Sequence, residues 1–312
     1  MEIKIKENNS GKRLDIFLSE FDSKVSRSQW KKRIKAGGVL VLGKKRSPHY
    51  FLHSGDTIET IVLEEKISEK IDSVVKDYKV DVVFKGDNYV VVNKPAGMVT
   101  HRDDIHKDGT LVDWLVKKFP EAKGIGGVDE RPGIVHRLDK EVSGLMVIAL
   151  SEEMFEHLKS QFSSRKVSKE YVALVHNVMR QDEGEVNLPI KRSKNKGIFV
   201  AVSDFLSVFS KTKSALTEYE VLEKFNHYTL IKVNILTGRT HQIRVHMRSI
   251  GHPIVGDKVY ITHDVKKKDK FVDLGRVWLY ASKLSFSDLS GEWQEFECDV
   301  PKELKEFLKE IK

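Results

Sequence analysis

Short apolar segments separated by Gly, Pro and Asp follow one another along the chain from residue 78 onward. The segments with the length and composition of buried strands are 80–84, 89–93, 145–150, 171–175 and 228–235. Apolar residues recur at helical spacing only in a few places, near 109–118 and 151–162. The pattern predicts an α+β unit whose sheet is mixed and mostly antiparallel.

A different pattern precedes this unit. Leu14, Phe17 and Leu18 are spaced as on one face of a helix, and the capping-box pattern of Ser26 and Gln29 predicts the start of a second helix. Gly37 and Gly38 are suited to end that second helix.

The second helix is expected to have two faces. Trp30 and Ile34 fall on one stripe and are expected to pack inward, while Arg27, Lys31 and Lys35 fall on the neighbouring stripe and point outward. The first residues of the chain are therefore expected to form a small α/β domain with a basic face.

The charge pattern is consistent with that division. The net charge of the chain is +8, and residues 1–60 contain 13 Lys and Arg against 7 Asp and Glu, while residues 23–55 contain no acid. A bare run of cations is typical of a solvated face, but a face without acids also suits a phosphate backbone. Residues 61–77 are rich in Asp and Glu and are interpreted as a linker, which gives domains at 1–60 and 78–312.

Length and composition limit the class of protein. A chain of 312 residues is long enough for one small and one large domain, and the single Cys298 excludes a disulfide framework within it. Because a secretory signal and long apolar runs are absent, we expect a cytoplasmic protein with no membrane contact.

Residues 133–150 contain the strongest chemical signal. They place one carboxylate, that of Asp139, between two apolar segments in the sequence His136-Arg137-Leu138-Asp139. Such an acid often only caps a turn. The wider sequence favours catalysis, because four further segments accompany it, which gives five in order: 92–97 with His101, 169–171, 237–246, and 251–254 with 256–257.

Together these segments resemble the RluA-type RNA pseudouridine synthases, which isomerise uridine in structured RNA. The resemblance covers nearly the whole chain beyond the linker and implies a reaction with no cofactor and no metal ion. It assigns the nucleophile to Asp139, whose carboxylate would add to the anomeric carbon or stabilise positive charge there. Direct attack on the sugar and a route through a glycal both remain open.

The resemblance also implies roles for other residues. Arg244 would compensate the charge of the buried aspartate, with Arg239 as the second choice and a phosphate contact as the favoured role of Arg239. Tyr171 would stack on the target base and could accept a proton, although an unperturbed tyrosine is a poor base near neutral pH.

Three more residues are expected around the RNA. Arg137 would fill the space left when the target uridine leaves its stack. His136 is expected to brace the loop rather than to act as an acid or base, and Lys169 to support structure or phosphate.

The first domain resembles the S4-type RNA-binding domain, which places Arg27, Lys31 and Lys35 at RNA. Where that family has an Asn-Gly turn, this chain has Leu42-Gly43. Large-subunit ribosomal RNA is the favoured substrate, transfer RNA is the alternative, and we expect a monomer with no obligate protein partner.

Some positions depart from the pattern, and two rival functions follow. Glu141-Val142 stands where Asp-Thr is usual, Leu150 where Lys is frequent and Tyr280 where a His is normal. One rival is an RNA-binding protein without activity, and another is an N-glycosidase, which needs an activated water and often a second acid. A metal site is not indicated, because His101 with His106 and His241 with His246 are five residues apart.

Overall fold

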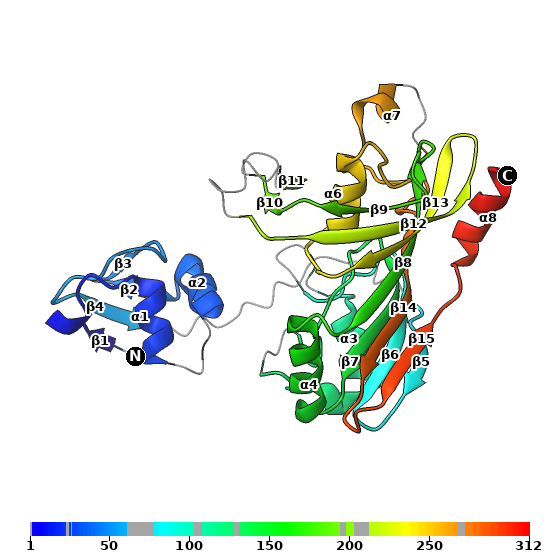
Figure 1. Cartoon of the computed structure of the whole chain (residues 1–312). Coiled ribbons are helices and arrows are strands. Elements are labelled where there is room, and N and C mark those ends of the chain that lie inside the picture. The colour runs from blue at the N-terminus through cyan, green and yellow to red at the C-terminus, as the bar shows by residue number, and fades with distance from the viewer. Residues whose placement is uncertain are drawn as a thin grey trace. The chain divides into compact units, whose positions relative to one another are not determined.

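The computed structural model describes residues 2–22, 25, 27–60, 78–102, 106, 108–127, 131–193, 198–202, 212–267 and 272–312. The chain divides into two compact units, Met1–Ser73 and Val74–Lys312 (Figure 1). The expected linker 61–77 lies outside the described residues. Among the helices that are described, none is both long and apolar enough to span a bilayer.

The smaller unit is an α/β fold with its own core. Its elements are β1 (Glu2–Lys4), η1 (Glu7–Asn9), α1 (Leu14–Phe21), α2 (Arg27–Ala36), β2 (Val39–Val41), β3 (Lys44–Lys45) and β4 (Thr57–Thr60). Its described strands pair antiparallel in the order β1-β4-β2-β3. Trp30 and Ile34 are buried on the inner side of α2, as expected, and α2 ends before Gly37, whose φ is +87°.

The β2–β3 hairpin turns at Leu42 and Gly43, whose φ angles are +53° and +69°. Two consecutive positive φ angles define the turn type that Asn-Gly favours. The hairpin therefore forms with Leu42 in a conformation that is unfavourable for its side chain.

The larger unit is built on one extended sheet. Its elements are β5 (Asp81–Lys85), β6 (Tyr89–Lys94), α3 (Leu111–Lys118), η2 (Pro120–Ala122), β7 (Ser143–Ala149), α4 (Glu152–Ser163), β8 (Ser168–His176), β9 (Glu183–Asn187), β10 (Ile190–Arg192), β11 (Phe199–Ala201), β12 (Leu216–Lys224), β13 (Tyr228–Ile235), α6 (Gln242–Ser249), α7 (His263–Lys267), β14 (Leu279–Ser287), β15 (Trp293–Glu297) and α8 (Lys302–Glu310). Within the described residues the sheet has the order β5-β6-β7-β14-β8-β13-β12-β9, and β15 pairs with β14.

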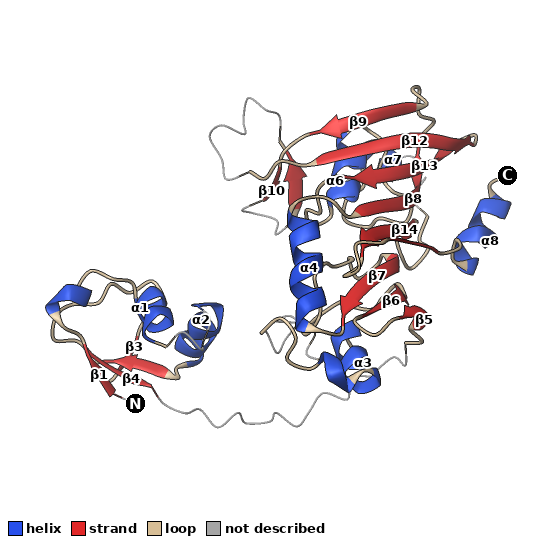
Figure 2. Cartoon of the chain, turned by 60° about the horizontal axis from the view of Figure 1, so that its bottom comes forward, coloured by secondary structure: helices blue, strands red, loops and turns tan. Residues whose placement is uncertain are grey.

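This topology confirms the predicted fold class. Only the pair β7–β14 is parallel among the described pairs of this sheet, and the other pairs are antiparallel. The strand β14 comes late in the chain but lies between β7 and β8, which are separated in the sequence only by α4. The helix α4 packs on β7, and α6 packs on β12 and on the β10–β11 hairpin (Figure 2).

The five predicted strands form, with boundaries shifted by a few residues. Others, such as β12 and β15, were not predicted, because Glu alternates with apolar residues along them and their apolar runs are short. The departures Val142, Leu150 and Tyr280 are all buried, the first two in the main core and Tyr280 beside Trp278 under α8.

Candidate active site

The loop that carries Asp139 precedes β7 and is tied down on both sides of this residue. The carbonyl of Leu138 accepts a hydrogen bond from the Thr100 hydroxyl at 3.0 Å, and the carbonyl of Lys140 accepts one from the Gly97 N–H at 2.6 Å. The Asp139 side chain is 15% exposed. The backbone of Asp139 is therefore fixed, while its carboxylate keeps partial access to solvent.

His136 ties the same loop to the sheet. Its Nε2 accepts a hydrogen bond from the Val147 N–H of β7 at 3.1 Å, and its ring stacks on Phe162 of α4 at 4.6 Å between centroids. Burial, followed by the charge of Lys169, lowers the pKa of His136 to about 3. The ring is thus neutral and holds the loop as an acceptor.

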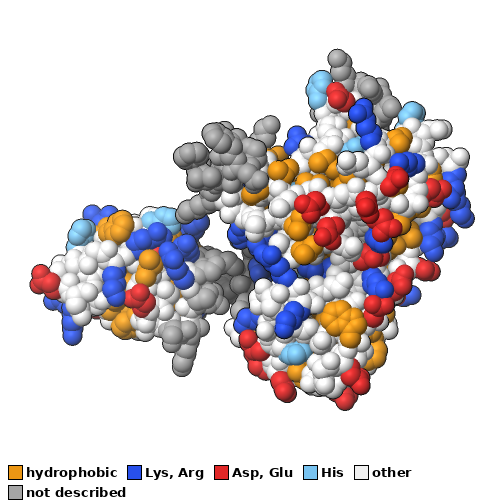
Figure 3. Space-filling view, viewed as in Figure 1, with side chains coloured by type: hydrophobic (Ala, Val, Ile, Leu, Met, Phe, Trp, Pro, Cys, Tyr) orange, Lys and Arg blue, Asp and Glu red, His pale blue; other side chains and the backbone are white. Residues whose placement is uncertain are grey.

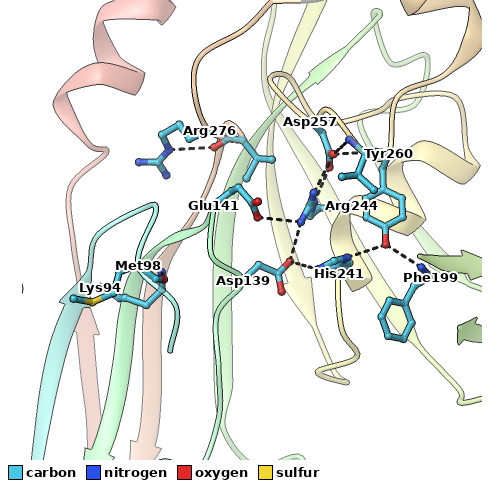
Figure 4. A network of polar contacts seen from close by, with 12 residues as sticks. Lys94, Met98, Asp139, Glu141, Phe199, His241, Arg244, Asp257, Tyr260 and Arg276 are labelled. Carbon is cyan, nitrogen blue, oxygen red and sulfur yellow. Dashed lines mark hydrogen bonds and ion pairs between the residues drawn. The ribbon is translucent and has the colours of Figure 1, made fainter. Parts of the chain in front are cut away.

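Arg244 faces Asp139 from the first turn of α6 (Figure 4). Its Nη1 lies 3.3 Å from Asp139 Oδ2 and 3.5 Å from Glu141 Oε2. On its other side, Nε and Nη2 donate to the two oxygens of Asp257 at 2.6 and 3.0 Å. This bidentate pair fixes the plane of the guanidinium and aims Nη1 at Asp139.

The charge of Arg244 is secured although its side chain is only 3% exposed. Burial alone would lower its pKa, but the hydrogen bonds and charge of Asp257, with the charges of Asp139 and Glu141, raise the pKa above the ordinary arginine value. The site therefore contains a permanent cation against the candidate nucleophile.

Two buried polar side chains hold α6 in place. Gln242 accepts hydrogen bonds from the Thr237 hydroxyl at 2.7 Å and from the Arg239 N–H at 3.1 Å, and its amide donates to Thr217 and to the Leu216 carbonyl. Further along the helix, His246 contacts Thr217 at 2.9 Å and the Leu188 carbonyl at 2.9 Å. The first turn of α6 is thereby fixed to β12.

Tyr171 and Lys169 come from β8, near the centre of the sheet. Burial, and then the charge of Asp139, raise the pKa of Tyr171 above the ordinary tyrosine value. Burial lowers the pKa of Lys169 to about 8, and its Nζ lies 5.6 Å from the centroid of the Phe162 ring. Lys169 is therefore mostly charged at neutral pH, and Tyr171 keeps its proton.

One cavity of about 470 Å³ brings these residues together. It is lined by all seven site residues that the sequence indicated in the larger unit: His136, Arg137, Asp139, Lys169, Tyr171, Arg239 and Arg244. Its apolar wall includes Ile134, Val135, Phe162, Leu236 and Leu279. Arg131 and Arg165 add to the cations of the lining. Figure 3 shows Lys and Arg side chains gathered around a hollow in this face of the larger unit.

The cations at the rim have local contacts as well. Nη1 of Arg137 lies 3.4 Å from His101 Nε2, and Arg239 donates from Nε to the Ser214 carbonyl at 3.0 Å. Neither contact neutralises the charge, because histidine and a carbonyl carry no formal negative charge here. The rim therefore presents positive charge toward the cavity.

The cations of the smaller unit are not all directed outward. Asp15 of α1 is fully buried and pairs with Arg13 at 3.1 Å, Arg27 at 2.9 Å and Lys31 at 3.6 Å. Burial would raise the pKa of Asp15, but the hydrogen bonds and charges of Arg13 and Arg27 lower it. The expectation that Arg27 and Lys31 only face solvent is thus incomplete, since both also anchor α1, whereas Lys35 is exposed.

Several residues of the site carried no predicted role. Asp257, His241, Gln242 and Tyr260 were not singled out for the chemistry, although all but Tyr260 lie in segments that the sequence had marked. The signal for Asp257 was its place after Gly256, and nothing local pointed to its contact with Arg244. No cluster of three or more metal-ligating side chains occurs in the part of the chain that the structure describes.

Two family patterns match the sequence. That of the RNA pseudouridylate synthases matches residues 88–249, and that of the S4 domain matches residues 12–58. An uncharacterized RNA pseudouridine synthase of Bacillus subtilis is 34% identical over 313 residues, covering 100% of this chain and 98% of that protein. Ribosomal large subunit pseudouridine synthase D of Pseudomonas aeruginosa is 38% identical over 250 residues, covering 80% of this chain and 74% of that protein.

Solved structures show the same fold. The human RNA pseudouridylate synthase domain containing 4 matches with a TM-score of 0.55 and 27% identity, over 74% of this chain and 92% of that one. The human RNA pseudouridylate synthase domain containing 1 matches with a TM-score of 0.57 and 24% identity, over 75% of this chain and 94% of that one.

Proposed function

The chain belongs to the RNA pseudouridylate synthase family and carries an S4 domain, and from this premise we propose that Asp139 is the nucleophile with which it isomerises uridine in RNA. The observation that supports this role most directly is the contact of Asp139 with the buried Arg244 at the edge of the cavity. An ionised carboxylate at such a place suits chemistry at an anomeric carbon.

The reaction exchanges one bond for another within the nucleotide. The bond from N1 of uracil to C1′ of ribose breaks, the base turns in place, and a bond from C5 to C1′ forms. The proton on C5 is lost and N1 gains one, so no atom enters the RNA overall. Asp139 would hold C1′, or the positive charge that develops on it, while the base turns.

Arg244 resolves the difficulty of keeping such a carboxylate reactive. A carboxyl group in an apolar pocket is driven toward its neutral form, and a neutral acid is no nucleophile. The guanidinium stabilises the ionised form and contacts Asp139 through Oδ2 only. Among the described residues no hydrogen bond reaches Oδ1, which leaves that oxygen for the sugar.

Tyr171 is proposed to lie against the uracil and, in its phenolate form only, to take the proton from C5. Its raised pKa makes the phenolate scarce at neutral pH but strongly basic once formed. The apolar wall of the cavity suits this chemistry as well, because water at the detached base would turn isomerisation into base loss.

The cations of the lining fit an extruded nucleotide. A uridine that enters this cavity must leave its stack, at a cost of a few kcal/mol that other contacts offset. We assign the vacated space to Arg137 and the flanking phosphates to Arg239 and Lys169. An apolar pocket can bind an unstacked base, and the positive charge around it can bind the phosphates of an RNA loop or end.

Ribosomal RNA of the large subunit is the proposed substrate. Relatives from Xylella fastidiosa and Pseudomonas aeruginosa, at 36% and 38% identity, are named for the ribosomal large subunit. The S4 domain, with exposed Arg27 and Lys35 on α2, would add an electrostatic contact to the RNA.

The test is tritium release from RNA labelled at C5 of uridine, with unmodified large-subunit ribosomal RNA and transfer RNA supplied separately. Asp139→Asn should abolish release, because the amide cannot act as the nucleophile. Glu141→Gln is the matched control: Glu141 also lies near Nη1 of Arg244, but its side chain is 44% exposed. This control should stay within about tenfold of the wild type.

Release by Asp139→Asn would remove the nucleophile role, and release from transfer RNA alone would overturn the substrate class. Mass spectrometry of the product separates the rival N-glycosidase, because isomerisation conserves RNA mass and base loss does not. Glu141 makes this control necessary, since it brings a second carboxylate to the same arginine.

A further inference from the structure

His241 is held at the site in an unusual conformation. It directly precedes α6 with a left-handed backbone (φ +57°), which is uncommon for residues other than Gly, although Asn, Asp and His adopt it more often than the rest. Its ring bridges two groups: Nδ1 lies 2.8 Å from the Tyr260 hydroxyl oxygen, and Nε2 lies 3.7 Å from Asp139 Oδ2 (Figure 4). Strained residues are frequent at functional sites, where the surroundings impose the conformation.

The contacts of Tyr260 determine which ring nitrogen carries the proton. The N–H of Phe199, in β11, donates to the Tyr260 oxygen at 3.0 Å. The Tyr260 hydroxyl is fully buried, and apart from His241 no acceptor for its hydrogen occurs among the described residues. A buried O–H without an acceptor would be costly, so the hydroxyl donates to Nδ1 of His241.

It follows that the proton of the neutral ring sits on Nε2. Burial lowers the pKa of His241 below the ordinary histidine value, against the opposing charge of Asp139, so the ring is neutral at pH 7. A neutral imidazole that accepts at one nitrogen donates at the other. The Nε2–H of His241 therefore points toward the same Oδ2 that Arg244 contacts.

We propose that His241 is a positioning residue that donates its Nε2 hydrogen to Asp139 Oδ2 when uridine enters the cavity. This inference rests on the proposed function of Asp139. The distance of 3.7 Å is too long for a hydrogen bond, and the proposal requires a small turn of the Asp139 side chain to shorten it. Catalytic hydrogen bonds are often long without substrate and shorten in the complex.

With both donors in place, His241 and Arg244 hold one oxygen of the carboxylate from two sides. The other oxygen, Oδ1, is then directed at C1′ of the ribose. The hydroxyl of Tyr260 determines the tautomer of the His241 ring. The backbone N–H of Phe199 donates to the Tyr260 oxygen and so orients this hydroxyl. The strand β11 thereby acts on the nucleophile through three hydrogen bonds and the imidazole ring of His241.

Two amide variants separate this role from a purely structural one. The His241→Gln side chain can place its amide nitrogen near the Nε2 position and retain the contact with Asp139. The His241→Asn side chain reaches only the Nδ1 position, but Asn suits the left-handed backbone better than Gln does. If His241 served only to adopt the left-handed backbone conformation, Asn would be the better replacement.

The proposal predicts the opposite order. Tritium release should keep a kcat within about tenfold of the wild type in His241→Gln and fall about 100-fold in His241→Asn, with KM unchanged in both. Tyr260→Phe should lower kcat in the wild type and have no further effect in His241→Gln, whose amide no longer depends on Tyr260 for its orientation. Thermal unfolding of each variant confirms that it is folded.

An equal loss in the two variants, a better Asn than Gln variant, or a change confined to KM would overturn the role of His241. These outcomes are distinct from a failure of the proposed function. If the wild type released no tritium, the proposed function would fail, whereas release by the wild type and by His241→Asn alike would refute this inference alone.

Discussion

The buried pair of Arg244 and Asp257 offers the sharpest perturbation of the site. Asp257→Asn keeps the size of the side chain but removes its charge. The Asn oxygen can still accept the backbone N–H groups of Val259 and Tyr260, which Asp257 Oδ1 accepts at 2.8 and 2.9 Å. Its amide nitrogen would then replace Oδ2 and face the Nε donor of Arg244, so that two donors meet.

The magnitude follows from burial and from the charges that remain. Removing one partner of a buried ion pair costs about 3–5 kcal/mol of unfolding free energy. Arg244 keeps Asp139 at 3.3 Å and Glu141 at 3.5 Å, so the lower end, about 3 kcal/mol, is expected. Because the guanidinium also loses its orientation, kcat should fall about 100-fold.

The assay is denaturant unfolding of the full chain, following the larger unit through its buried Trp278, together with tritium release. Asp273→Asn is the matched control, since Asp273 pairs with Lys258 at 2.7 Å but is exposed. This control should leave the unfolding midpoint and kcat unchanged. If Asp257→Asn lost less than about 1 kcal/mol and kept its kcat, Asp257 would not be the residue that orients Arg244.

Three further results are expected. Tyr171→Phe should slow proton removal from C5, so that uridine deuterated at C5 reacts more slowly than uridine in this variant; equal rates would argue against Tyr171 as the proton acceptor. Burial lowers the pKa of Lys94 to about 7 from the ordinary 10.5, so between these values the unfolded chain binds a proton that the folded chain has released. The unfolding free energy of the wild type should therefore rise with pH above 7 by up to about 1.4 kcal/mol per pH unit, and this rise should be absent in Lys94→Met. Denaturation is measured from pH 6 to 9, and the same dependence of unfolding free energy on pH in the wild type and the variant would contradict this. Leu42→Asn should stabilise the β2–β3 hairpin by about 0.5–1 kcal/mol, seen as slower hydrogen exchange of its amides, because Asn tolerates the positive φ that strains Leu; unchanged exchange would show that the turn is not under strain.

Much of the fold could be predicted from apolar patterning. The strands β6 and β7 are apolar runs and β13 is an apolar-rich strand with alternating burial, and this burial follows from their composition. The helix α6 was not predicted, because its inward side chains include Gln242, Arg244 and His246. Polar side chains share the buried surface of α6 with Ile243 and Met247, so the apolar pattern is weak, and the stability of the helix depends on partners in β12 that are distant in the sequence.

The site was predictable in its parts but not in its contacts. The motif around Asp139 and the segment containing Arg244 indicated both residues. The sequence could not show that Asp257 turns the arginine or that Tyr260 orients His241, because such contacts depend on three-dimensional packing and have no periodicity. The anchoring of Arg27 and Lys31 by Asp15 was missed for the same reason.

The position of β14 between β7 and β8 has a consequence in time. Asp139 precedes β7 and Tyr171 lies on β8. These two strands are joined in the sheet only through β14, which is synthesised more than a hundred residues later. A nascent chain that ends before Leu279 already contains both residues but still lacks β14, the strand that lies between β7 and β8. The cavity can therefore take its final geometry only after β14 has been synthesised.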